Sequence, residues 1–129
     1  MSDRRGVIFI IFDLPVQTVN ERRQYAKFRK SILRSGYVFF QKSVYVKLLR
    51  NISSADNEIQ KIDDLAPDAG EIQTITMNLN VFRTLHAVRG AEFHLSDFAD
   101  DVVIWGKERN LDMMIEDEEL VRLFGKQEL

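Results

Sequence analysis

The chain has 129 residues, 45% of them hydrophobic, and a net charge of −2, which is the composition of one globular domain. It has no cysteine, which excludes disulfide bonds and thiolate metal sites. The apolar run of residues 7–12 is too short to span a bilayer and is interrupted by Asp13. We therefore expect a cytoplasmic protein with no membrane segment and no signal peptide.

The first predicted element is a buried central strand at residues 7–12, because its residues are β-branched or aromatic on both faces. A loop follows, in which Pro15 prevents the strand from continuing its ladder of hydrogen bonds. Thr18 or Asn20 can cap the helix that comes next.

The period becomes helical over residues 21–35, and Gly36 is the expected stop just beyond the helix. The apolar stripe predicted to face the core contains Tyr25, Phe28, Ile32 and Leu33.

Two strands are expected next, at residues 37–41 and 43–49. No Gly, Asn or Pro separates them, so the sequence fits either one bent strand or two strands that meet at a tight corner. Their aromatic residues are expected to pack in the core, since no RNA-binding aromatic motif is present.

A second helix is expected over residues 51–66, a strand at 71–77 and a third helix at 79–88, closed by Gly90. The residues expected to face inward from the second helix are Ala55, Ile59, Ile62 and Ala66.

The order over residues 7–77 is β-α-β-β-α-β, which predicts an α+β protein of the ferredoxin-like class. We expect a core at residues 1–90 and an acidic tail at 91–129, the latter with a late strand near 102–105 and a helix around 116–124. A lone late strand needs a sheet edge, and the partner in a homodimer can supply one.

Charge is distributed unevenly along the chain. Residues 1–50 carry a net charge of +8, and residues 91–129 carry −7. A basic first part of the chain indicates a surface that meets an anion such as a phosphate backbone. Plain segregation of charge for solubility is the alternative.

The helix at 21–35 carries cations spaced four, three and four residues apart, which places them on one face. Like charges at this spacing repel, and bound phosphates would relieve the repulsion. A solvated outer face is the alternative. The residues predicted to bind nucleic acid are Arg22, Arg23, Lys27, Lys30, Arg34 and Lys42.

Asp13 follows a buried strand directly, so two interpretations remain open. It is either a candidate ligand for Mg²⁺, which needs only one or two carboxylates together with water and substrate phosphates, or a turn residue that accepts backbone hydrogen bonds from residues 14–16. A dimer could bring two copies of Asp13 together.

These features together resemble a known family, the small CRISPR-associated adaptation proteins that partner the spacer integrase and are also named endoribonucleases. The matching motifs cover roughly residues 6–106, and KFRK and SVYVKLL resemble the branch found with type II effectors. The motifs are the strand ending in Asp13-Leu14-Pro15, the helix ERRQYAKFRK, Gly36, Gln41-x-Ser43-Val44-Tyr45, and the strand and helix that end at Gly90.

The resemblance implies a symmetric homodimer in which the late strand VVIW adds to the partner's sheet. It also implies a complex with integrase dimers and double-stranded spacer DNA, and a magnesium-dependent phosphodiesterase activity centred on Asp13. We therefore expect a dimeric DNA-binding scaffold for spacer acquisition. The alternatives are a magnesium-dependent endonuclease or endoribonuclease that uses paired Asp13 as catalytic residue and metal ligand, and a toxin-like ribonuclease that acts alone.

Three positions depart from the family pattern: Phe12 replaces a tyrosine, Phe39 an arginine and Tyr45 a phenylalanine. The missing arginine removes a cation near the scissile phosphate and weakens the prediction of a nuclease. The tail beyond about residue 106 matches no part of the pattern.

Overall fold

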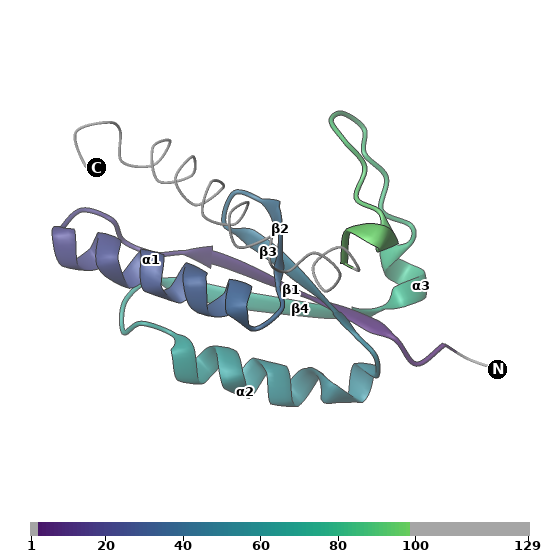
Figure 1. Ribbon diagram of the computed structural model, residues 1–129, viewed down its shortest axis with the longest axis horizontal. Coiled ribbons are helices and arrows are strands. Elements are labelled where there is room, and N and C mark those ends of the chain that lie inside the picture. Colours follow the sequence, from purple (N-terminus) through teal and green to yellow (C-terminus); the bar gives the residue numbers. More distant parts are fainter. Residues whose placement is uncertain (1–2, 99–129) are drawn as a thin grey trace. The chain divides into compact units, whose positions relative to one another are not determined.

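The computed structural model describes residues 3–98 (Figure 1). The chain divides into two units, residues 1–94 and 95–129, and the first contains all the elements discussed below. The predicted late strand and tail helix lie outside the described residues, and the expected boundary near residue 90 stays a prediction. No helix among the described residues is long and apolar enough to cross a membrane.

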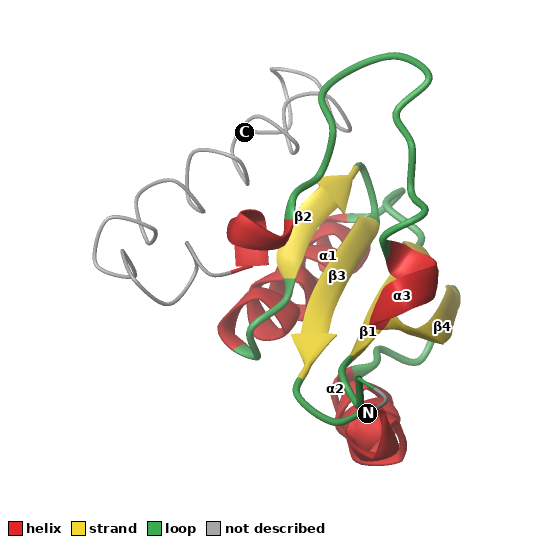
Figure 2. Ribbon diagram, turned by 90° about the vertical axis from the view of Figure 1, so that its right-hand side faces the viewer, coloured by secondary structure: helices red, strands yellow, loops and turns green. Residues whose placement is uncertain are grey.

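One four-stranded antiparallel sheet forms the centre of the first unit, in the order β2-β3-β1-β4. Helices α1 and α2 lie side by side across one face of this sheet (Figures 1 and 2). This arrangement confirms the predicted α+β, ferredoxin-like class. The strands are β1 (Gly6–Asp13), β2 (Val38–Gln41), β3 (Val44–Leu49) and β4 (Glu71–Asn78).

Strand β1 is central, as predicted, and its side chains alternate between the two faces of the sheet. The Phe12 ring contacts Tyr25 and Phe28 of α1 in tilted and edge-on arrangements, so the even-numbered residues of β1 face the helices. Phe9 packs against Phe82 on the other face. Asp13 shares the parity of Phe9 and therefore lies on the face away from α1 and α2.

Helix α1 (Val19–Arg34) begins and ends within two residues of the predicted limits. Thr18 and Glu21 form a reciprocal capping box at its start. At its end, Gly36 has φ +99°, and the N–H groups of Gly36 and Tyr37 donate to carbonyls of the last turn. This Schellman arrangement explains why the glycine stops the helix.

The predicted apolar stripe of α1 is correct except at one position. Tyr25, Phe28 and Ile32 are buried, whereas Leu33 is only half-buried and Arg29 is fully buried in its place. Arg29 adopts this position because its Nε donates to the Tyr45 hydroxyl and its guanidinium lies 5.5 Å from the Tyr45 ring centroid.

The joint between β2 and β3 is a tight corner of an antiparallel hairpin. Ser43 adopts φ +62°, a left-handed conformation that non-glycine residues rarely take. The register shifts between Phe39 and Gln41, and the bulge helps the chain to turn without a glycine.

The prediction for the second helix was partly wrong. Its first residues form a 3₁₀ turn, η1 (Ile52–Ser54), before helix α2 (Ala55–Leu65). Glu58 is buried and Ile59 is exposed, the reverse of the expected pattern. The carboxylate is tolerated inside because the Tyr37 hydroxyl (3.1 Å) and the Lys47 ammonium (3.1 Å) both donate to it.

The third helix, α3 (Leu79–Phe82), is shorter than the predicted 79–88. Its last hydrogen bonds, including those from Thr84 and Leu85, run to carbonyls only three residues back. The helix therefore ends early. Four phenylalanine rings pack together on the sheet face away from α1 and α2. These rings belong to Phe9, Phe40, Phe82 and Phe93.

Candidate nucleic-acid interface and carboxylate site

Asp13 is the last residue of β1, and its side chain is exposed. The register places it directly opposite Glu71, the first residue of β4. Residues directly opposite in an antiparallel pair have Cβ atoms about 4.5–5.5 Å apart. Two carboxylates therefore share one edge of the sheet, where like charges repel unless a cation or proton reduces the repulsion.

The loop after β1 does not use the Asp13 carboxylate. Within residues 3–98, no hydrogen bond joins this carboxylate to the N–H group of Leu14 or Val16, and Pro15 has no N–H to donate. Other side chains hold the loop instead: Arg22 donates to the carbonyls of Val16 and Gln17, both at 3.2 Å. The interpretation of Asp13 as a turn residue therefore has no support from the geometry.

A glycine lets the chain approach Asp13 closely just before β4 begins. Gly70 has φ +97°, and a Cβ there would lie 2.8 Å from the Asp13 carbonyl oxygen and 2.7 Å from Leu14 Cδ2. Only a residue without a side chain fits this space, so Gly70 sets where β4 starts. It thereby places Glu71 beside Asp13.

The corner between β2 and β3 lies at the same end of the sheet. Ile11 pairs with Val44, and the Phe12 N–H donates to the Ser43 carbonyl at 3.1 Å. Lys42, exposed at this corner, therefore belongs to the Asp13 end of the sheet. One predicted nucleic-acid residue thus lies at the same end of the sheet as the two carboxylates.

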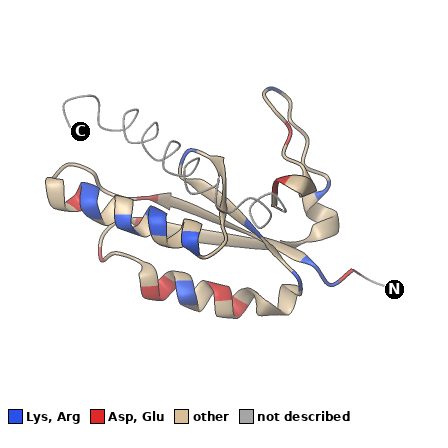
Figure 3. Cartoon of the chain, viewed as in Figure 1, with Lys and Arg blue, Asp and Glu red and all other residues tan. Residues whose placement is uncertain are grey.

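Lys and Arg recur along the whole of α1 (Figure 3), and four of the six cations of the helix are exposed. The core-facing side of the helix is occupied by Tyr25, Phe28 and Ile32. We call the four exposed cations the α1 basic face. They are Arg23, Lys27, Lys30 and Arg34.

The other two cations of the helix are not on this face. Arg22 is half-buried because its guanidinium binds the loop carbonyls. Arg29 is buried against Tyr45. The spacing of the sequence separated the exposed set correctly, but it gave no indication that a guanidinium lies in the core.

Glu71 is not among the site residues predicted from the sequence. It is the first residue of a strand that follows a Pro- and Gly-containing loop, a position at which acids are common. Only the pairing of β4 with β1 shows that it faces Asp13. The sequence therefore contained no local signal that would have identified it.

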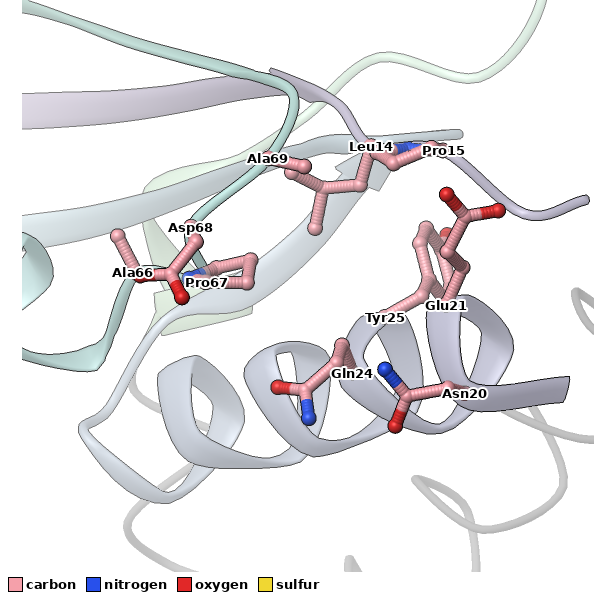
Figure 4. Close-up of a pocket in the computed structure, with 10 residues that line it drawn as sticks. All are labelled: Leu14, Pro15, Asn20, Glu21, Gln24, Tyr25, Ala66, Pro67, Asp68 and Ala69. Atoms are coloured by element: carbon pink, nitrogen blue, oxygen red, sulfur yellow. The ribbon is translucent and has the colours of Figure 1, made fainter. Parts of the chain in front are cut away.

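A pocket of about 390 Å³ lies between the first turns of α1 and the loop 66–69, close to Leu14 (Figure 4). Among the described residues that line it, the only charged ones are Glu21 and Asp68, both of which are acids. Glu21 is already engaged, because its Oε1 accepts the N–H groups of Gln17 and Thr18. This pocket is therefore unsuited to a phosphate.

The carboxylates at the Asp13 end of the sheet fit a hard cation only in part. Among the described residues, no group of three or more His, Asp or Glu side chains could hold a metal ion. Mg²⁺ nevertheless binds through one or two carboxylates and completes its shell with water and phosphate oxygens. Asp13 and Glu71 supply carboxylates of that kind.

The fold and these surfaces define a class, the small ferredoxin-like α+β proteins with a basic helix on the outside of the sheet. The family model for CRISPR associated protein Cas2 matches residues 7–84, which include all of the sheet except its first residue, Gly6, and all of α1. The chain belongs to this family, which confirms the resemblance seen in the sequence motifs and assigns the chain to CRISPR adaptation.

Several relatives bear the name CRISPR-associated endoribonuclease Cas2. The protein of Ligilactobacillus salivarius (strain UCC118) is 36% identical over 83 residues, 64% of this chain and 82% of the relative. That of Lacticaseibacillus rhamnosus (strain ATCC 53103 / LMG 18243 / GG) is 34% identical over 85 residues, 66% and 84% of the two chains. That of Streptococcus mutans (strain UA159, ATCC 700610) is 35% identical over 83 residues, 64% and 76% of the two chains.

Proposed function

We propose that this protein acts as the dimeric, DNA-binding scaffold of CRISPR spacer acquisition and holds double-stranded spacer DNA for the integrase. The observation that carries the proposal is the α1 basic face. Its four cations are all exposed, at spacings of four, three and four residues, on a helix whose opposite side is buried.

Duplex DNA is the ligand that this face fits best. Like charges three and four residues apart destabilise a helix slightly, and phosphates that approach them relieve this repulsion and release counterions. The face offers long, flexible cations and no aromatic platform on which a base could stack. Binding should therefore be sequence-independent and should weaken steeply with salt.

The sheet face away from α1 and α2 supports the dimer. Ile11 and Ile75 are 42% and 52% exposed on this face, and β4 is an edge strand with one side of its backbone unpaired among the described residues. Exposed apolar residues beside an open edge are features that a second copy would cover. The partnership with the integrase rests on family membership.

The geometry at Asp13 favours a second candidate function, a magnesium-dependent phosphodiesterase. The Asp13 carboxylate is exposed, unused by its own loop and opposite Glu71. It also lies on the face proposed for the dimer, so a second copy would bring its own Asp13 to the same interface. A bound Mg²⁺ would supply charge neutralisation at a phosphodiester and a more acidic water.

In this second function the chain's own residues have defined tasks. Asp13 and Glu71 would hold the cation, and Lys42 would attract the substrate phosphate to the same end of the sheet. Position 39 supplies no cation, because it is a phenylalanine. Its ring packs edge-on against Tyr45 on the face that α1 covers. The relatives named endoribonucleases support this candidate only by likeness.

Equilibrium binding to a labelled duplex at several salt concentrations tests the scaffold proposal. Replacing Lys27 and Lys30 with glutamine should reduce the slope of log K against log salt by about 2, since each phosphate contact contributes about 0.9. The matched control replaces Lys61 and Arg89, two exposed cations outside α1. Equal loss in both double variants, or no binding by the wild-type chain, would contradict the proposal.

A further inference from the structure

Four arginines gather at the end of the sheet opposite to Asp13. β1 begins there at Gly6, which pairs with Leu49 of β3 on one side and Asn78 of β4 on the other. The residues that precede β1, the residue that follows β3 and the short helix α3 that follows β4 therefore meet around the start of β1. We call the group the arginine cluster, and its members are Arg4, Arg5, Arg50 and Arg83.

The backbone beneath the arginine cluster is fixed by hydrogen bonds. The Ile52 N–H donates to the Arg4 carbonyl at 2.7 Å, and the Leu79 N–H donates to the Arg5 carbonyl at 3.0 Å. The Arg83 N–H donates to the Leu79 carbonyl at 2.9 Å. Three segments distant in sequence thus hold the arginines in one place, and none of the four lies on a free tail.

Positive charge in the cluster is only partly balanced. The Asp3 carboxylate accepts three hydrogen bonds from Arg5: from the backbone N–H to Oδ1 at 3.0 Å, from Nε to Oδ1 at 3.1 Å and from Nη2 to Oδ2 at 2.9 Å. These hydrogen bonds lower the pKa of Asp3 to about 2, with a smaller contribution from the charge of Arg83. Asp3 is therefore ionised at neutral pH and is already engaged by Arg5.

No carboxylate among the described residues balances the charge of the other three guanidinium groups. Within residues 3–98, no salt bridge engages Arg4, Arg50 or Arg83, and the side chains of all three are exposed. Arg83 makes one hydrogen bond, at 3.3 Å, to the neutral amide of Asn80. The cluster therefore presents a net charge of about +3 to solvent, from side chains whose planar forks match phosphate oxygens.

We propose that the arginine cluster is a second phosphate-binding surface, separate from the α1 basic face, that takes phosphodiester groups of duplex DNA. The proposal rests on the DNA-binding function proposed above. It adds a contact at the opposite end of the sheet from Asp13 and a defined set of residues for it.

The size of the cluster fits a nucleic-acid backbone. β3 and β4 flank β1, so Arg50, which follows β3, and Arg83, at the end of α3 after β4, lie on opposite sides of the start of β1. Duplex DNA carries one negative charge per about 1.7 Å of its axis, so arginines on three separate segments can face more than one phosphate. An isolated phosphate would engage one arginine at a time on so open a surface.

The first experiment compares duplex binding by the full chain and by the Arg50→Gln/Arg83→Gln double variant across a range of salt concentrations. We expect affinity to fall about tenfold at 0.1 M salt and the salt slope to drop by about 2, equally for unrelated sequences. The Lys61→Gln/Arg89→Gln variant removes the same charge elsewhere and should retain near wild-type affinity. Both arginines are exposed, so the urea midpoint should stay unchanged.

The outcomes separate the two proposals. If the wild-type chain binds duplex and the Arg50→Gln/Arg83→Gln variant matches it in affinity and slope, the arginine cluster is not a DNA contact, although the scaffold proposal stands. If the wild-type chain binds no duplex, the scaffold proposal fails first. A variant that unfolds would be replaced by Arg4→Gln, for which a smaller loss of the same kind is expected.

A direct readout is the NMR signal of the arginine Nε–Hε groups. Adding duplex should shift the signals of Arg50 and Arg83 together, and adding inorganic phosphate at equal ionic strength should shift them far less. Equal shifts with inorganic phosphate would overturn the assignment to a nucleic-acid backbone.

Discussion

Replacing Glu58 with alanine tests the polar network that attaches α2 to the sheet. The Glu58 side chain is only 10% exposed, and it accepts from Tyr37 Oη at 3.1 Å and from Lys47 Nζ at 3.1 Å. Its loss leaves the Lys47 ammonium, which is 24% exposed, without its carboxylate. Breaking a fully buried pair costs about 3–5 kcal/mol. Because Lys47 keeps its bond to the Ser35 carbonyl, we expect a smaller loss of about 2–3 kcal/mol in the free energy of unfolding.

Urea denaturation measures this loss, and two further variants identify its source. Glu58→Gln keeps an acceptor and should cost about half as much as Glu58→Ala. Asp63→Ala removes an exposed acid from the same helix and should change stability by less than about 0.5 kcal/mol. In a double-mutant cycle, Lys47→Ala and Glu58→Ala together should cost clearly less than their sum. A Glu58→Ala loss as small as that of Asp63→Ala would refute the reasoning.

Three further predictions follow from the same structure. Gly70→Ala should lower the free energy of unfolding by at least about 2 kcal/mol by thermal denaturation, because the new Cβ meets backbone beside Asp13 at a positive φ; an unchanged melting temperature would contradict the close approach. Burial, the charge of Glu58 and the hydrogen bond to Glu58 raise the pKa of Tyr37, so the contribution of Tyr37 to stability is complete below about pH 10 and is lost as the pH rises further, by up to about 1.4 kcal/mol per pH unit. Tyr37→Phe should therefore reduce the pH dependence of the free energy of unfolding, measured with urea, between pH 9 and 11. An unaltered pH dependence in this variant would rule this out. Ile75→Glu should convert the proposed dimer to monomer in analytical ultracentrifugation, and a dimer that persists at low concentration would place the interface elsewhere.

The parts of the fold that local chemistry determines were predictable. Helix α1 has a capping box at Thr18 and a glycine stop at Gly36, and both signals act within a few residues of the helix ends. The ferredoxin-like order followed from the change of period along the chain. The α1 basic face followed from spacing, since a helix fixes which residues share a side.

The errors arose where a contact distant in sequence decides the environment. Burial of Arg29 and Glu58 depends on Tyr45, Tyr37 and Lys47, which lie on other elements. A sequence pattern treats a charged residue as exposed, so it placed Ile59 inside instead of Glu58. A charged group is tolerated in the core only when hydrogen-bond or ion-pair partners lie beside it, and the fold determines which residues those partners are.

The candidate sites show the same division. Asp13 could be selected from the sequence, because it ends a buried strand abruptly. Its neighbour Glu71 and the gathering of Arg50 and Arg83 at the start of β1 required the register of the sheet. A register slip of one residue would have moved all of these side chains to other faces.

We propose that the protein serves spacer acquisition as a scaffold and not through chemistry at Asp13. The most direct test is reconstituted spacer integration with the cognate integrase, comparing the wild-type chain with Asp13→Ala at matched folding and dimer content. We expect equal integration by both proteins, because the α1 basic face is unchanged in the variant. Integration that collapses in Asp13→Ala while dimer formation and duplex binding persist would contradict it and would establish Asp13 as the functional carboxylate.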